Sequence, residues 1–366
     1  MTAPHRARRL VEALADRMRG MPTPMPTGTG STPAAVLEAT RLTRAGRLTE
    51  AMSVLQGGSA PTMPSFPTMP SPFATMPGSF GSGARTTAGA PSGRVTRGSF
   101  TGPAGTRAYR VVAPTDPQER PPLLVMLHGG TQDAEVFAAA TGMDDLAERE
   151  GFVVAYPEQA RSANAMGYWN WFDPSHQGRD GEPSLIAGIV RTVAAEHGID
   201  RRRVFVAGFS AGAAMAAVMG SAYPDLVAGV GVHSGLAAGA ARDVGSAFAA
   251  MRSGAYRPAP TTVPTIVVHG ADDGTVAIAN AHQVVESALA GAPGCARTEE
   301  RGGGGTTRSW IRERWTDRDG RVRAESWTVH GSGHAWSGGR AGGSYTDPAG
   351  PDASAAMVDF FGLGRS

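Results

Sequence analysis

The stretch Val204–Gly212, VFVAGFSAG, runs directly into small, helix-compatible residues that continue to Met219. An apolar run of β-forming residues, a Gly-x-Ser-x-Gly turn and a helix predict a nucleophile elbow, which lifts one serine hydroxyl out of a buried parallel sheet. The tight turn leaves no space for side chains two residues before and after the serine, which accounts for Gly208 and Gly212. Ser210 is therefore the predicted nucleophile.

The motif alone is weak evidence in a chain with 50 glycines, and a serine nucleophile needs an acid and a histidine later in the chain. The predicted strand Thr265–Val268 is followed by the loop HGADDGTV, residues 269–276. Its carboxylates lie after the carboxyl end of a sheet strand, where catalytic groups gather in open α/β sheets. Asp272 and Asp273 could both be turn residues instead. We predict that one of them is the acid, and we favour Asp273.

The candidate base lies in the segment HGSGHAW, which begins at His330 after a further predicted strand. Its glycines leave the backbone free enough for His334 to reach the serine. His330 and His269 are rivals, but each directly follows a strand and is interpreted as an end-of-strand residue. In this arrangement His334 takes the proton of Ser210, and Asp273 fixes the histidine tautomer and stabilises the imidazolium. The alternative is a loop histidine bound to backbone.

An oxyanion loop is predicted earlier, in the segment Leu123–Gln132, LLVMLHGGTQ. A buried strand that ends in His-Gly-Gly supplies a backbone N–H that complements the N–H of Ala211, the residue after the nucleophile. Gly130 or Thr131 is the predicted second donor, and His128 is predicted to hold the loop in place. The alternative is an ordinary pair of glycines at a strand end.

Aromatic residues are candidates for binding the substrate. Trp169, Trp171 and Phe172 follow a loop rich in polar turn residues, and Trp336 lies two residues after the proposed base. These rings predict an apolar cleft beside the serine. The competing interpretation is that they fill the core, as large aromatic side chains usually do.

Five segments in order, between Thr96 and the C-terminus, resemble the poly(3-hydroxybutyrate) depolymerase family of esterases, which is related to feruloyl and acetylxylan esterases. The segments are LHGGTQ (127–132), YWNWF (168–172), GFSAGAAM (208–215), HGADDGTV (269–276) and GHAWSGG (333–339). The resemblance implies an α/β-hydrolase fold, with a mostly parallel central sheet and helices on both faces, and hydrolysis of carboxylic esters through an acyl-enzyme on Ser210. Many members have cysteines where this chain has Tyr168 and Gly130, so a disulfide at that place is excluded.

The resemblance does not fix the acyl group. We expect a short-chain hydroxyalkanoate polyester or oligoester as substrate, because an enzyme inside the cell meets stored polyester more readily than plant cell wall. A feruloyl or acetylxylan esterase is the alternative. A catalytically silent polymer-binding protein is a third possibility, opposed by the presence of all three triad candidates in the expected order.

Composition narrows the possible partners. The formal net charge is only +2, so nucleic acid is not expected as a partner. The single cysteine, Cys295, excludes an internal disulfide, and the histidines lack metal-ligand spacing, so neither metal nor other cofactor is predicted. No apolar run has the length of a membrane span. The N-terminus lacks a Sec-type apolar region, so we expect a cytoplasmic location, with an extracellular one, as in many family relatives, as the alternative.

The sequence divides into a helical N-terminal segment (1–56), a flexible linker rich in Pro, Gly and Met (57–94) and a catalytic domain (95–366). Thr-Met-Pro recurs in the linker, whose methionines and phenylalanines are hypothesised to adhere to a polyester granule. In the catalytic domain, the predicted strands are Val95–Phe100, Arg107–Val112, Leu123–Leu127, Phe152–Tyr156, Val204–Ala207, Val227–Val232, Thr265–His269 and Ser326–Val329. The first two are predicted to form an antiparallel hairpin. Helices are predicted at Ser184–His197, Ala211–Tyr223 and Ala279–Ala290.

Overall fold

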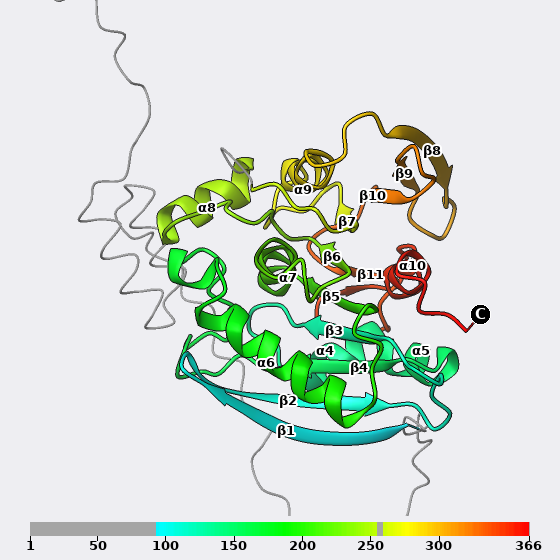
Figure 1. The fold of residues 1–366 in the computed structure, drawn as a ribbon. Helices are drawn as coiled ribbons and strands as arrows, with labels where there is room; N and C mark the ends of the chain where they lie inside the picture. Colours follow the sequence, from blue (N-terminus) through cyan, green and yellow to red (C-terminus); the bar gives the residue numbers. More distant parts are fainter. Residues whose placement is uncertain (1–92, 255–258, 366) are drawn as a thin grey trace, which may run out of the picture.

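A ten-stranded sheet of the order β1-β2-β4-β3-β5-β6-β7-β10-β9-β8 runs through the protein, with helices on both faces (Figure 1). The computed structural model describes residues 93–254 and 259–365. The strands are β1 (Arg94–Gly102), β2 (Gly105–Ala113), β3 (Leu123–Leu127), β4 (Val153–Pro157), β5 (Val204–Phe209), β6 (Gly229–His233), β7 (Thr265–Gly270), β8 (Ala296–Gly302), β9 (Trp310–Thr316), β10 (Val322–Val329) and the short pair β11 (Trp336–Ser337) and β12 (Thr346–Asp347). The helices are α4 (Ala134–Thr141), α5 (Met143–Glu150), the 3₁₀ helix η1 (Pro174–His176), α6 (Gly181–Glu196), α7 (Ala211–Ala222), α8 (Val244–Ser253), α9 (Ala279–Leu289) and α10 (Ala353–Phe360).

The predicted N-terminal segments, 1–56 and 57–94, lie outside the described residues apart from positions 93 and 94. No helix within the described residues combines the length and the apolar character needed to cross a bilayer.

The centre of the sheet is parallel, from β4 through β3, β5, β6 and β7 to β10. Strands β3, β4 and β5 are buried along their whole length, as expected for continuous apolar strands that helices cover on both faces. The predicted hairpin is also present, because β1 pairs antiparallel with β2. The predicted α/β architecture and all eight predicted strands are therefore confirmed.

Alternate residues of the central strands point to opposite faces of the sheet and pack in two separate apolar clusters. Leu123, Val125 and Leu127 of β3 pack in one apolar cluster with residues of α6 and α7. Leu124 and Met126 point to the opposite face and pack with residues of α4, α5 and α10. Figure 1 shows these two groups of helices on opposite sides of the sheet. Because both faces are covered, the loops at the strand ends are the accessible part of the sheet.

Two strands of the ten-stranded sheet were not expected from the sequence. Beyond β10 the sheet continues with β9 and then β8, both antiparallel to their neighbours. Strand β8 reads ARTEERG and is exposed along nearly its whole length, so it lacks the apolar alternation that marks a half-buried strand. The sheet is therefore wider than predicted, on the side away from the hairpin.

Candidate active site

The Gly-x-Ser-x-Gly segment forms the sharp turn that its sequence predicts. Ser210 has φ 54° and ψ −118°, a conformation that residues with side chains rarely adopt, and α7 begins at the next residue. A Cβ atom on Gly212 would lie 2.1 Å from the carbonyl oxygen of Leu127, and one on Gly208 would lie 2.5 Å from the backbone of Gly212. Any larger residue at either position would collide with main chain, which confirms the steric reason for both glycines.

The serine, histidine and aspartate candidates lie in one hydrogen-bonded series. His334 Nε2 is 3.0 Å from Ser210 Oγ, and His334 Nδ1 is 2.7 Å from Asp273 Oδ2. A carboxylate can only accept, so Nδ1–H donates to Asp273 and Nε2 is left to accept the serine proton. The other oxygen of Asp273 accepts the backbone N–H groups of Thr275 and Val276, each at 2.8 Å. The carboxylate is thus held rigidly behind the histidine.

The structure distinguishes the two adjacent aspartates. The Asp273 side chain is fully buried, whereas Asp272 is exposed and its N–H donates to the carbonyl of Ser332 at 3.0 Å. Burial raises the pKa of Asp273, but the hydrogen bond and the charge of His334 outweigh it, so the pKa of Asp273 lies below its ordinary value. Asp273 therefore stays ionised next to the histidine.

Two backbone N–H groups remain available beside the nucleophile. Ala211 is the first residue of α7, where an N–H has no acceptor within the helix. Gly130 lines the same cavity as Ser210, and no hydrogen bond of its N–H is found within the described residues. The N–H of Thr131 donates to the carbonyl of Met166 at 3.1 Å, so the prediction of Thr131 as a donor is wrong. Ala211 and Gly130 are the candidate pair.

The other predicted histidines have structural positions. His128 is buried, donates through Nδ1 to the Gly129 carbonyl at 2.8 Å and accepts the N–H of Gln159 through Nε2 at 3.1 Å. His269 is buried at the end of β7, and its Nε2 donates to the Val276 carbonyl at 2.8 Å. His330 is exposed at the end of β10. The predicted loop-holding position of His128, and the interpretation of the other two as end-of-strand residues, are confirmed.

Sequence reasoning missed His233, the last residue of β6. This side chain is fully buried, its Nε2 accepts the N–H of Ser337 at 2.9 Å, and its ring stacks on Trp336 at 4.7 Å. Burial lowers the pKa of His233 well below its ordinary value, and the neighbouring histidines His269 and His334 lower it further. His233 therefore supports the loop that follows His334 as a neutral ring. The position of His233 at the carboxyl end of a parallel strand was the sequence feature that could have marked it as a residue near the site.

A largely apolar cavity of about 510 Å³ opens above the serine. Trp171 and Phe172 line it as predicted, together with rings that the sequence analysis did not place there, such as Tyr345, which is 49% exposed. Helix α8 supplies a further wall that was not predicted. The lining residues are Gly130, Asn164, Tyr168, Trp171, Phe172, Phe209, Ser210, Val244, Ala247, Phe248, Met251, Arg252, Gly274, Thr275, His334 and Tyr345.

Trp169 and Trp336 do not line this cavity, so their prediction as substrate-binding residues is wrong. Both are essentially unexposed, at 0% and 1%. The indole N–H of Trp169 donates to the His128 carbonyl at 3.1 Å, and that of Trp336 donates to Ser354 Oγ at 3.0 Å. Each ring finds its hydrogen-bond partner inside the protein, which removes the need for its polar edge to reach solvent. The core interpretation holds for these two tryptophans.

A strand–serine–helix turn at the carboxyl edge of a doubly wound sheet, with its histidine and acid in the chain order found here, belongs to the α/β-hydrolases. Residues 108–310, more than half of the chain, match the sequence model of a family described as "Esterase PHB depolymerase". The chain belongs to that family.

Individual relatives agree with this assignment. The chain is 35% identical over 202 residues to poly(3-hydroxyalkanoate) depolymerase C of Paucimonas lemoignei, covering 51% of this chain and 48% of that protein. It is 33% identical over 165 residues to acetylxylan esterase A of Talaromyces purpureogenus, covering 43% of each. The chain spans less than half the length of these curated relatives. The solved acetyl xylan esterase from Aspergillus awamori superposes with a TM-score of 0.58 at 20% identity, covering 74% of this chain and 100% of that one, which supports the α/β-hydrolase fold.

Proposed function

We propose that this protein is a serine carboxylic-ester hydrolase that forms an acyl-enzyme on Ser210. The observation that carries the proposal is the hydrogen-bonded series from Ser210 Oγ through His334 to the buried Asp273, which begins at the floor of an apolar cavity. A catalytically silent polymer-binding protein has no need for this series. Membership of an esterase family supports the same reaction class.

The reaction follows from these positions. Ser210 Oγ attacks the ester carbonyl carbon while its proton passes to His334 Nε2, and Asp273 stabilises the resulting imidazolium. The N–H groups of Ala211 and Gly130 donate to the oxyanion that develops. His334 then gives its proton to the leaving alkoxide, which departs as the alcohol. A water molecule, deprotonated by the same histidine, attacks the acyl carbon and releases the acid and free Ser210.

The surroundings of the histidine favour this proton transfer. Burial lowers the pKa of both His233 and His269, so both rings remain neutral near neutral pH. The Asp273 carboxylate, 3.5 Å from His269 Nε2, is therefore not shared with a second positive charge. Its charge is available to the imidazolium of His334 alone.

For the substrate, we infer a short-chain hydroxyalkanoate polyester or oligoester. The apolar cavity suits a small branched acyl group, and the 35% identical relative is named a poly(3-hydroxyalkanoate) depolymerase. A second candidate, an acetyl or feruloyl ester of a polysaccharide, is favoured by a polar cavity that shares Asn164, Phe172 and Val244 with the first. That cavity also contains Arg161 and Arg242, which suit a hydroxyl-rich alcohol portion.

The test compares substrates on one preparation of the full chain. Amorphous hydroxybutyrate polymer, hydroxybutyrate oligomers, acetylated xylan and methyl ferulate are incubated side by side, with Ser210→Ala as the control for each. Release of hydroxybutyrate at the highest kcat/KM supports the polyester. Faster release of acetate or ferulate supports the second candidate. Equal rates for the wild type and Ser210→Ala on every ester contradict the acyl-enzyme itself.

We also propose that residues 57–94 bring the enzyme to the surface of its polymer. The support is compositional: the segment repeats Thr-Met-Pro and carries phenylalanines, and its only charged residues are Arg85 and Arg94. Deletion of residues 1–90 is expected to weaken co-sedimentation with polymer granules while leaving hydrolysis of soluble p-nitrophenyl butyrate unchanged. Unchanged co-sedimentation contradicts the proposal.

A further inference from the structure

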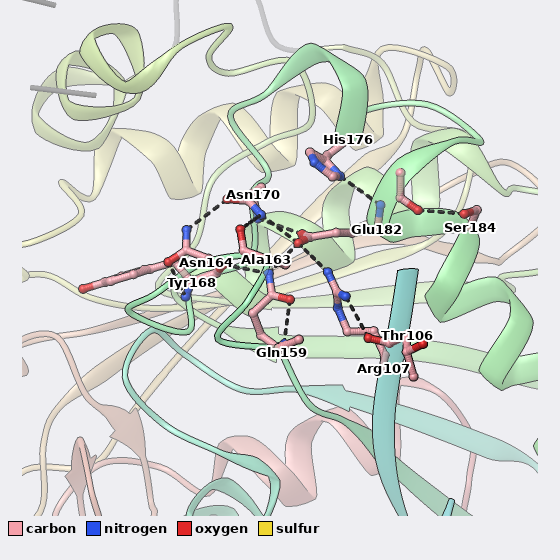
Figure 2. Close-up of polar contacts among 12 residues, drawn as sticks. Thr106, Arg107, Gln159, Ala163, Asn164, Tyr168, Asn170, His176, Glu182 and Ser184 are labelled. Atoms are coloured by element: carbon pink, nitrogen blue, oxygen red, sulfur yellow. Dashed lines mark hydrogen bonds and ion pairs between the residues drawn. The ribbon is translucent and has the colours of Figure 1, made fainter. Parts of the chain in front are cut away.

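A second buried carboxylate, that of Glu182, lies outside the serine site. Glu182 is the second residue of α6, and its side chain has no exposed surface. Oε1 accepts Arg107 Nη2 at 3.0 Å and Asn170 Nδ2 at 2.8 Å, and it also accepts Gln159 Nε2. Oε2 accepts the backbone N–H of Asn170 at 2.8 Å. Figure 2 shows these donors converging on Glu182 from β2, from the loop after β4 and from the Asn170 segment.

These surroundings require a group that only accepts. Four N–H donors from three side chains and one backbone amide face the two oxygens of Glu182. A carboxylate accepts on both oxygens, whereas the amide of a glutamine must point its NH₂ group at one of these donors. Glutamine at this position therefore leaves at least one buried donor without an acceptor, although it matches glutamate in size.

One of these donors, Asn170, belongs to the segment of residues 164–172 that forms one wall of the cavity. Asn170 Oδ1 accepts Asn164 Nδ2 at 3.0 Å, and Asn164 Oδ1 accepts the N–H groups of Met166 and Tyr168 at 3.1 and 3.3 Å. Gln159 Nε2 donates to the Tyr168 carbonyl at 2.8 Å as well as to Glu182. Several hydrogen bonds of residues 164–170 thus connect, through Asn170 and Gln159, to one carboxylate, as the dashed lines of Figure 2 show.

The same segment contacts the oxyanion loop. The ring of Tyr168 covers Gly130 so closely that a Cβ atom there would lie 2.0 Å from Tyr168 Cε1. Met166 accepts the N–H of Thr131, and the Trp169 indole donates to the His128 carbonyl, each at 3.1 Å. The position of the Gly130 amide is therefore coupled to the position of residues 166–169.

We propose that Glu182 is a positioning residue for ester hydrolysis, fixing the cavity wall and, through it, the Gly130 oxyanion donor. This role rests on the proposed function. Glu182 lines neither cavity, so it acts through Asn170 and Gln159 and not by contact with substrate. Arg107, itself 3% exposed, supplies the fixed positive charge that keeps the carboxylate in place.

The test variant is Glu182→Gln, and the matched control is Glu196→Gln, an exposed glutamate at the other end of the same helix. With p-nitrophenyl butyrate, a shift of the oxyanion donor by about 1 Å is expected to lower kcat by about 100-fold, with a smaller change in KM. The apparent pKa in the pH profile of kcat/KM is expected to stay unchanged, because His334 and Asp273 are untouched. Glu196→Gln is expected to match the wild type.

A double variant separates positioning from charge balance. Arg107→Met combined with Glu182→Gln removes the buried guanidinium that the single variant leaves without a counter-ion. The double variant is expected to regain thermal stability but not kcat. Recovery of wild-type kcat in the double variant, or a Glu182→Gln enzyme with wild-type kcat per folded molecule, overturns the proposal. Equal hydrolysis of p-nitrophenyl butyrate by the wild type and Ser210→Ala instead overturns the proposed function, so the two failures are distinguishable.

Discussion

Asp273 and Glu182 are two fully buried carboxylates with different partners. Each accepts hydrogen bonds on both oxygens, and each receives at least one of them from backbone. Asp273 faces a histidine whose side chain is 12% exposed toward the cavity and which can gain or lose a proton, whereas Glu182 faces an arginine that keeps its charge at every accessible pH. A buried carboxylate therefore stabilises a positive charge that comes and goes on His334 in one place, and the permanent positive charge of Arg107 in the other.

The largest expected effect tests whether the site around His334 and Asp273 carries out the reaction. Ser210→Ala removes the nucleophile and is expected to lower kcat for p-nitrophenyl butyrate by on the order of 10⁶-fold, as in other enzymes with a complete triad. Thermal unfolding should stay close to that of the wild type, which shows that the loss is chemical. Substantial activity in this variant would show that another group carries the reaction.

The next effect compares adjacent aspartates. Asp273→Asn leaves the shape of the site intact but presents the wrong hydrogen-bonding group to His334 Nδ1, and kcat is expected to fall by about 10⁴-fold. Asp272→Asn alters an exposed side chain and is expected to change kcat by less than about twofold. A large loss in Asp272→Asn with little loss in Asp273→Asn would reverse the assignment of the acid.

A stability measurement sharpens the contrast between the two carboxylates. Glu182→Ala leaves Arg107 buried without a counter-ion and is expected to lower the free energy of unfolding by about 3–5 kcal/mol. Asp273→Ala leaves a histidine that can stay neutral, so a smaller loss is expected. Urea unfolding at pH 7 checks both variants. Equal losses of unfolding free energy would mean that leaving Arg107 and leaving His334 without a carboxylate destabilise the protein to the same extent.

The smallest effect concerns pH. Burial lowers the pKa of His128, His233 and His269 in the folded state, so below pH 6.5 the unfolded chain binds more protons than the folded one. Stability is therefore expected to fall as pH decreases through 6.5, each histidine contributing up to about 1.4 kcal/mol per pH unit. His233→Gln should reduce the slope of unfolding free energy between pH 5 and 7.

Much of this site could be predicted because its chemistry constrains local sequence. Any Cβ atom at Gly212 would collide with the Leu127 carbonyl, so this position must be glycine, and the turn around Ser210 can be predicted from the sequence alone. The chain order of Ser210, Asp273 and His334 is likewise fixed by the order of the strands that carry them. The parallel strands could be predicted because burial on both faces leaves an uninterrupted apolar run.

The remainder depends on contacts between distant segments. Whether a tryptophan faces a cavity or the core depends on a partner such as Ser354 for Trp336, 18 residues away, and sequence spacing gives no sign of it. Thr131 is excluded as a donor only by the carbonyl of Met166. Glu182 reads as an ordinary charge near a helix start, because the residues that bury it come from three separate segments. Charged β8 is stabilised by its pairing with β9 and has no apolar signal of its own.

Strand β8 has a consequence for the behaviour of the protein in solution. It is the last strand of the sheet, and the outer edge of such a strand can pair with another chain. Along it, Glu299 forms ion pairs with Arg297 and Arg301, and Glu300 pairs with Arg312 of the neighbouring strand. An incoming strand would have to desolvate these charges to form its ladder. The least apolar strand of the sheet thus protects the protein against edge-to-edge aggregation.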